Sequence, residues 1–292
     1  MSRTSLLTLC LTLLSVTLLS ACSTYRSGLD SATSGSTAAA TAFDEALAVW
    51  TAERGTQAGL QKSIDLLETL LESEPGHQEA LTLLSRSYYF MADGYTADPE
   101  AKKPIFEMGT YYGERAMAAD SAFKAEIEQG KKKSEAVSAL QKDDIMAIYW
   151  TASNLGKWAR GQGFATLVKY KGYVAAMMTQ ALALDETAFY AGPPRYWGAY
   201  YAAAPGFAGG DMGKAREMFE KTKSMNPEYL GTYVLYADYY AKKVQDKDLF
   251  RSLLQHVLDT PADVLPEMLP EQNVEKQKAQ RLMDTIDDLF AE

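Results

Sequence analysis

The sequence predicts an all-α fold over most of its 292 residues. The clearest helical signal lies near the C-terminus, where apolar side chains recur at helical spacing along one stripe: Leu249, Phe250, Leu253, Leu254, Val257 and Leu258. Alternating runs of Val, Ile and Thr joined by hairpin dipeptides, which would indicate strands, are scarce. Alanine and leucine dominate between short breaks from residue 42 onward. We therefore expect helices throughout the folded part of the chain.

Internal repeats refine this expectation, because four segments resemble the second helix of the tetratricopeptide (TPR) repeat. In each, small or apolar residues recur at the repeat's spacing and a Glu, Asp or Asn follows; the segments are 63–75, 109–120, 174–185 and 215–227. First helices are expected around 81–88, 155–156, 197–204 and 233–240. The residues expected to pack the repeats together are Leu67, Ala116, Ala181, Ala215, Phe219 and Tyr236.

The spacing of these repeats departs from the usual TPR period of about 34 residues. The anchor residues Leu70, Ala116, Ala181 and Thr222 are 46, 65 and 41 residues apart. Longer helices or insertions would account for this, and insertions are expected at 92–104, 124–142 and 161–171. The stretch 271–290 has an apolar face and is expected to cap the array. The predicted fold is thus a TPR-like helical-repeat solenoid with divergent, elongated repeats and a C-terminal capping helix.

The first 21 residues predict a bacterial lipoprotein signal peptide. Arg3 precedes a run of about a dozen mainly apolar residues, as in secretory signals. The run ends in Leu-Ser-Ala-Cys at 19–22, which resembles the lipobox of lipoproteins. Cys22 is therefore the expected site of lipid attachment. An ordinary secretory signal, which would leave Cys22 as a free thiol, is the alternative.

A lipoprotein of this kind would be held on the periplasmic side of a bacterial membrane. Ser23, directly after the cysteine, favours the outer membrane over the inner one. Residues 22–41 lack a core-forming pattern and are expected to form a flexible tether behind the lipidated cysteine. The TPR-like helical domain is expected at 42–292.

The composition disfavours several classes of function. Lys and Arg number 29 against 38 Asp and Glu, which gives a net charge of −9 and disfavours nucleic acid as a partner. Only two His and two Cys are present, and Cys10 would leave with the signal peptide, so metal sites and thiol catalysis are disfavoured. Neither a phosphate-binding loop nor a nucleophile elbow is found. We expect neither an enzyme nor a cofactor-binding protein.

One candidate site combines an arginine with aromatic residues beside two glycine-rich turns. An arginine could pair with a ligand carboxylate through two parallel hydrogen bonds, and aromatic rings could line an amphipathic cleft. The candidate residues are Arg195, Tyr196, Trp197, Tyr200, Tyr201 and Phe207. The same residues also fit a structural role, in which the rings fill grooves between helices and the arginine pairs with a nearby acid. Asp211 is expected to cap the helix that starts near Met212.

Residues 191–240 carry the most specific motifs of the chain. They are a Gly-Pro-x-Arg turn at 192–195, a Pro-Gly-Phe-x-Gly-Gly-Asp turn at 205–211 and a Tyr-Ala-x-Tyr-Tyr helix at 236–240. This segment resembles the TatT family, the tethered periplasmic T components associated with TRAP transporters. The lipobox and the overall length agree with the resemblance.

The resemblance implies a TPR-like lipoprotein that could form a homotrimer and whose partner is the periplasmic solute-binding protein of a TRAP system. It also implies a central cleft or pore that handles an apolar ligand or an organic acid. The alternative is a generic TPR scaffold lipoprotein that binds peptides in cell-envelope assembly. A hydrolase on a helical toroid is a further alternative, for which the sequence offers no catalytic set.

Overall fold

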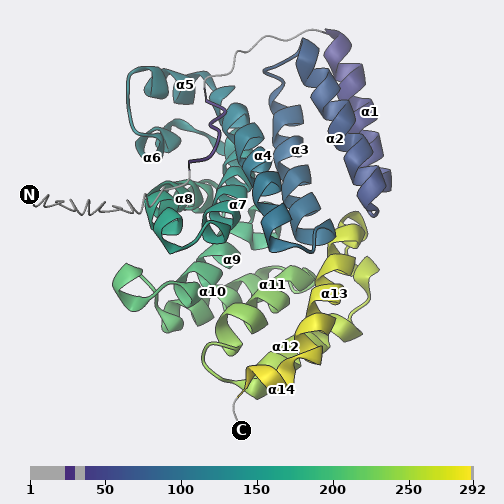
Figure 1. The fold of residues 1–292 in the computed structure, drawn as a ribbon, viewed down its shortest axis with the longest axis vertical. Coiled ribbons are helices and arrows are strands. Elements are labelled where there is room, and N and C mark those ends of the chain that lie inside the picture. The colour runs from purple at the N-terminus through teal and green to yellow at the C-terminus, as the bar shows by residue number, and fades with distance from the viewer. Residues whose placement is uncertain (1–23, 30–36, 291–292) are drawn as a thin grey trace, which may run out of the picture.

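The computed structural model describes residues 24–29 and 37–290, and every regular element within them is a helix (Figure 1). The longer helices are α1 (Thr37–Glu53), α2 (Gln57–Ser73), α3 (Gln78–Phe90), α4 (Pro99–Ala118), α7 (Ile145–Gly161), α8 (Phe164–Leu184), α9 (Ala188–Ala203), α10 (Met212–Met225), α12 (Lys247–Asp259) and α13 (Leu269–Asp284). The shorter ones are α5 (Ser121–Glu128), α6 (Lys133–Ala136), α11 (Leu230–Leu235) and α14 (Ile286–Leu289).

Short 3₁₀ and π segments join these helices. The 3₁₀ turns are η2 (Val137–Ala139), η3 (Lys142–Asp144), η4 (Gly206–Ala208), η6 (Ala262–Val264) and η7 (Pro266–Met268). Two π-helical segments, η1 (Met91–Tyr95) and η5 (Tyr236–Ala241), continue α3 and α11. Within the described residues, no helix is sufficiently long and apolar to cross a membrane.

Successive helices pack in pairs, as expected for a TPR-like array. The pairs are α1 with α2, α3 with α4, α7 with α8, α9 with α10, and α11 with α12. The four segments that the sequence marks as second helices fall on α2, α4, α8 and α10. The prediction of an all-α helical-repeat fold is therefore confirmed.

The irregular spacing of the repeats has two structural causes. The longest interval, between α4 and α8, contains the extra helices α5 and α6 and two 3₁₀ turns, where an insertion at 124–142 was predicted. The insertion predicted at 161–171 is wrong, because α8 already starts at Phe164. That stretch lengthens the helix to 21 residues instead of adding a loop.

Close packing of α4 on α7 depends on a glycine. A Cβ atom at Gly113 would lie 2.1 Å from the Thr151 hydroxyl oxygen and 2.8 Å from that of Ser85, so only glycine fits. The Ser85 hydroxyl donates to the Gly109 carbonyl at 2.7 Å, and the Asn154 amide donates to the Ser85 carbonyl at 2.9 Å. These buried polar contacts join α3, α4 and α7 where the helices approach most closely.

The core forms two apolar clusters. One spans α1 to α8 and is joined by Val274 of α13, whereas the other is built by α10 to α14. The stripe predicted on α12 is buried in the second cluster at Phe250, Leu253, Leu254 and Val257. The predicted repeat-packing residues have no exposed surface: Leu67, Ala116, Ala181, Ala215, Phe219 and Tyr236.

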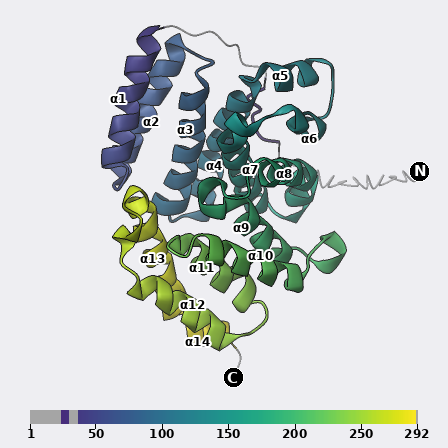
Figure 2. The same ribbon diagram turned by 180° about the vertical axis from the view of Figure 1, so that it is seen from behind.

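The C-terminal helices return to the start of the array. Both views place α13 against the lower ends of α1, α2 and α3 (Figure 1, Figure 2). At this junction Glu271 of α13 pairs with Arg54, which follows α1, and with Arg86 of α3. The Tyr95 hydroxyl donates to the Arg54 carbonyl at 2.7 Å. The predicted capping stretch therefore closes the array into a ring.

The N-terminal segment packs against the helical domain in residues 24–29. Glu114 of α4 is fully buried and accepts hydrogen bonds from Tyr25, from Ser27 at 2.7 Å and from the Gly28 amide at 3.2 Å. Lys133 of α6 pairs with the same carboxylate at 2.9 Å. A Cβ atom at Gly28 would lie 2.1 Å from the Tyr111 carbonyl oxygen, so the segment lies directly on α4.

This contact differs from the flexible tether predicted at 22–41. The segment has no helical pattern, and it is held by a partly buried tyrosine and by hydrogen bonds to one buried carboxylate. The helical part also begins earlier than residue 42, since α1 starts at Thr37. The predicted signal peptide and Cys22 lie outside the described residues.

Candidate functional site

A cavity of about 360 Å³ lies where the two core clusters meet. Its walls come from α3, η1, α7, α9, α11, η5 and α13, so it occupies the middle of the ring. This volume is at the lower end of the range typical of small-molecule sites. The apolar and aromatic part of its lining consists of Tyr89, Phe90, Tyr149, Trp150, Phe189, Tyr229, Val234, Leu235, Tyr239, Val274 and Leu282.

Both π-helical segments line the cavity. Segment η1 contributes Asp93, and η5 contributes Asp238 and Tyr239. In η5 the amide of Lys242 donates to the carbonyl of Ala237 at 3.0 Å, five residues back instead of four. The wider turn changes the direction of the side chains that follow, and such segments occur frequently at functional sites. The sequence analysis missed this feature because the apolar pattern of a π segment resembles that of an ordinary helix.

One end of the cavity holds a half-buried ionic cluster around Asp93. Its carboxylate contacts Lys278 of α13 and lies 3.4 Å from the Lys157 ammonium of α7. Burial alone would raise the pKa of Asp93, but the two lysines outweigh it and hold that pKa well below its usual value. Burial lowers the pKa of Lys278, and its contacts with Asp93 and Glu275 more than reverse this. The pKa of Lys157 is also raised, so Asp93, Lys157 and Lys278 are charged at neutral pH.

The cluster holds more cations than carboxylates, and the further acid of η5, Asp238, is paired with Lys242. Glu275 pairs with Lys278 at 2.7 Å, so Asp93 and Glu275 face three cations. The third is Arg281, which lines the cavity, is exposed and forms no ion pair with any residue that the structure describes. This end of the cavity therefore suits the acidic group of an amphipathic ligand.

Arg86 and Glu271 form the opposite polar wall. The Arg86 guanidinium donates to the Glu271 carboxylate at 2.9 Å and lies over the ring of Trp50 at 4.4 Å. Burial lowers the pKa of Arg86, and the pairing with Glu271 opposes this shift. Because Glu271 also pairs with Arg54, this wall is part of the ring closure.

Arg195 lines the cavity but is engaged by the backbone. It donates to the Tyr190 carbonyl at 2.7 Å, the Phe189 carbonyl at 3.2 Å and the Tyr149 hydroxyl at 3.3 Å. Its guanidinium lies 4.3 Å from the centre of the Tyr229 ring. Phe189, Tyr190 and Ala191 are all left-handed, with φ of 45°, 54° and 56°. Residues with a side chain disfavour this left-handed conformation, so the turn is strained, and Arg195 stabilises it by binding two of its carbonyls.

The other five predicted site residues do not line this cavity. Tyr196, Trp197, Tyr200 and Tyr201 form a chain of ring contacts along α9, with Trp197 5.2 Å from Tyr200 and 5.6 Å from Tyr201. Phe207 lies in η4 and is 88% exposed. The structure therefore separates the predicted site into one cavity residue, an aromatic row and an exposed phenylalanine.

The cavity residues that the sequence analysis missed come from distant parts of the chain. Asp93, Lys157 and Lys278 are widely separated in sequence and meet only in the folded protein. On α13 the residues Glu271, Val274, Glu275, Lys278 and Arg281 recur three and four apart, so a charged face was visible in the sequence. No group of His, Cys, Asp and Glu among the described residues could hold a metal ion.

A known protein family matches nearly all of the helical domain. The model of a family described as TRAP transporter T-component matches residues 56–290. The match extends from the start of α2 to the end of α14 and includes every residue that lines the cavity. A comparison with curated proteins gives no significant match.

Proposed function

Since the chain belongs to the TRAP transporter T-component family, it is an accessory component of a TRAP transporter, and we propose that it binds the solute-binding protein of that system and exchanges an organic ligand with it. The family match confirms the resemblance seen in residues 191–240. The exchange would be passive, without catalysis. The proposed location is the periplasmic face of a bacterial membrane, where a lipid on Cys22 anchors the chain, in the outer rather than the inner membrane. A homotrimer is part of the same proposal.

The cavity is the observation that carries the ligand proposal. Its aromatic and aliphatic walls suit a hydrocarbon or ring system, and its cationic end suits a carboxylate. Lys278 and Lys157 are already paired with Asp93, whereas Arg281 is free of acidic partners among the described residues. We assign the ligand to the class of amphipathic organic acids, with its acidic group at Arg281.

Binding of a dansyl-labelled fatty acid to the purified mature protein tests this assignment. Arg281→Ala should weaken binding by about ten- to a hundredfold, because a charge-assisted contact contributes roughly 1.5–3 kcal/mol. Val234→Trp should abolish binding by filling the apolar part. Arg251→Ala, on α12 outside the cavity, is the matched control and should bind like the wild type. Equal affinity in all four proteins would contradict the ligand site.

The partner is tested separately by measuring mass in solution with and without the solute-binding protein of the same organism. We expect a stable oligomer that gains mass when the binding protein is added. A monomer that ignores the binding protein but retains peptides would favour the alternative of an envelope scaffold.

A further inference from the structure

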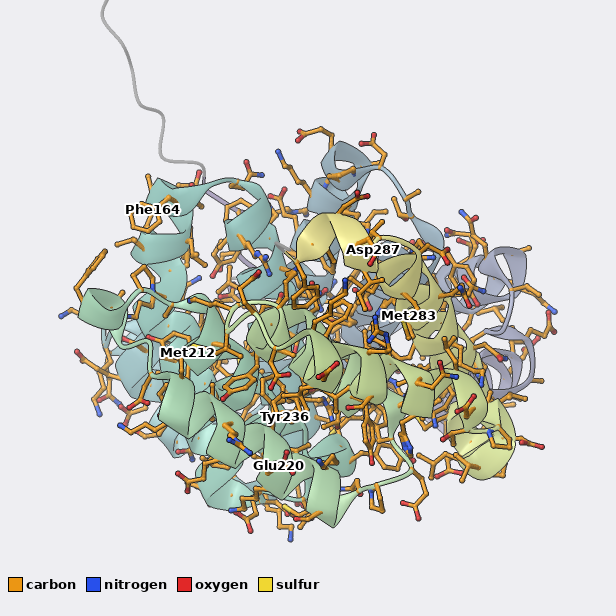
Figure 3. All side chains as sticks on the ribbon, turned by 90° about the horizontal axis from the view of Figure 1, so that it is seen from below. Phe164, Met212, Glu220, Tyr236, Met283 and Asp287 are labelled. Atoms are coloured by element: carbon orange, nitrogen blue, oxygen red, sulfur yellow. The ribbon has the colours of Figure 1, made fainter. Side chains whose placement is uncertain are left out.

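The first turns of α8 expose an apolar face. Phe164, Leu167 and Val168 are 63%, 36% and 53% exposed, and their spacing places them on one side of the helix. Phe207 of η4 belongs to the same region, because Lys171 of α8 donates to the carbonyl of Ala208 at 2.5 Å. Figure 3 shows Phe164 at the outer edge of the molecule, away from Met283 and Asp287 of the C-terminal helices. Exposed apolar residues that are grouped on one face mark interaction surfaces.

The N-terminal segment identifies what lies next to this face. Tyr25 packs against Tyr170 of α8, with ring centres 5.2 Å apart, and against Trp158 of α7 at 5.7 Å. Tyr170 is six residues from Phe164, or about 9 Å along the helix axis. Cys22 is three residues before Tyr25 and so lies within about 10 Å of it along the chain. A lipid on Cys22 would therefore emerge beside the exposed face of α8.

This position is fixed by the contacts of the segment. Glu114, which is buried, and Lys133 hold Tyr25 and Ser27 in a partly buried hydrogen-bonded cluster, so the chain that leads to the anchor is fixed to the domain at this point. The acyl chains of Cys22 would thus keep α8 close to the membrane surface.

The charges around this face complement an anionic membrane. Between Asp144 and Asp211 the sequence contains only two acidic residues, Asp185 and Glu186, in a chain that is acidic overall. Both are paired, with Lys142 and Lys221. The start of α8 itself carries two lysines, Lys169 and Lys171, and no carboxylate. Cations beside exposed aromatic and aliphatic residues are typical of helices that lie in a lipid interface.

We propose that the face formed by Phe164, Leu167, Val168 and Phe207 lies in the interface of the phospholipid bilayer that carries the anchor. The inference rests on the lipid attachment at Cys22 proposed above. It orients the domain, with α8 and η4 toward the bilayer and α12 to α14 pointing away from it (Figure 3). The face would be partly inserted among the lipid headgroups.

Site-specific fluorescence tests this orientation. In the mature lipoprotein Cys10 is removed and Cys22 is blocked, so an introduced cysteine is the single reactive thiol. Val168→Cys and Phe207→Cys would be labelled with the NBD fluorophore, and Ser252→Cys on the exposed side of α12 is the matched control. The lipidated proteins would be reconstituted into phosphatidylcholine and phosphatidylglycerol vesicles containing a doxyl-labelled lipid quencher.

We expect several-fold stronger quenching by the doxyl lipid at positions 168 and 207 than at 252. Equal quenching at all three positions, with the protein floating with the vesicles, would overturn the orientation but leave the Cys22 anchor intact. A label at 168 that is shielded from water but not quenched would indicate a second copy or another protein on this face and would also overturn it. Protein that fails to float with the vesicles would remove the anchor and this inference together.

Discussion

Arg54 and Glu271, which are 217 residues apart, form a two-pronged ion pair that closes the ring. The Arg54 guanidinium donates through Nε at 3.2 Å and through Nη2 at 3.1 Å, one bond to each carboxylate oxygen. The side chains are only 3% and 11% exposed. The first repeat is thereby joined to the last helix, and the cavity in the middle of the ring depends on that junction.

Glu271→Gln should lower the free energy of unfolding by about 3 kcal/mol, because it leaves the buried charge of Arg54 and the partly buried charge of Arg86 without a counter-ion. Urea unfolding followed by circular dichroism measures the change. Glu53→Gln is the matched control, since Glu53 pairs with Lys62 at the surface, and it should cost less than about 1 kcal/mol. Similar losses in both variants would contradict a special role for the ring closure.

Two glycine-to-alanine substitutions should change stability in opposite directions. Gly113→Ala places a methyl group 2.1 Å from the Thr151 hydroxyl oxygen and should destabilise the fold by roughly 1–3 kcal/mol. Gly172→Ala in α8 meets no atom within 4 Å and should stabilise it by about 0.5–1 kcal/mol through helix propensity. Chemical denaturation of both proteins checks the signs, and a neutral or stabilising Gly113→Ala would show that α4 and α7 can separate at little cost.

Arg195→Lys should destabilise the protein by about 2–3 kcal/mol, because lysine cannot bind the carbonyls of Phe189 and Tyr190 together. Thermal unfolding measures this loss, and Arg281→Lys serves as the control with an unchanged midpoint. If Arg195→Lys melts like the wild type, the left-handed turn does not need the guanidinium. Ligand affinity unchanged in a folded Arg195→Ala protein would in addition rule out a role of Arg195 in reading a carboxylate.

Asp93 should make the free energy of unfolding fall more steeply as the pH is lowered into the acid range. Its pKa is lower in the folded protein than in the unfolded chain, so its contribution is present above about pH 4 and is lost as pH falls through the folded value. The stability difference between wild type and Asp93→Asn should therefore shrink below about pH 4. Urea unfolding between neutral and acidic pH measures it, with Asp248→Asn, whose side chain is 99% exposed, as the control. A difference that is constant with pH would contradict the proposed pairing.

Much of the secondary structure could be predicted because its causes are local. The stripe on α12 follows from helical spacing alone, and Asp211 caps α10 by accepting from the Lys214 amide at 3.1 Å, as predicted. The second helices of four repeats could be recognised from their spacing and from the Glu, Asp or Asn that follows each of them. The start of α8 was missed, since a glycine on each side of Gln162 suggested a loop, whereas Gly163 ends that loop and the helix follows at once.

The candidate site was predicted only in part. The motifs around Arg195 predicted a site on α9, and Arg195 lines the cavity. The neighbouring rings of Tyr196, Trp197 and Tyr200 pack along the helix instead, because the side on which a ring lies depends on what packs against it.

The sequence by itself determined the helical class, the TPR-like order of the repeats and the family, and the anchor at Cys22 stays a prediction from it. These features depend on spacing within a few turns or on short motifs. Only the tertiary structure decided that Glu271 closes the ring, that Asp93 meets Lys278 in a cavity, and that Glu114 holds Tyr25 against α4. Each of these contacts joins residues far apart in the chain, and the geometry that brings them together arises from the packing of all the helices between them.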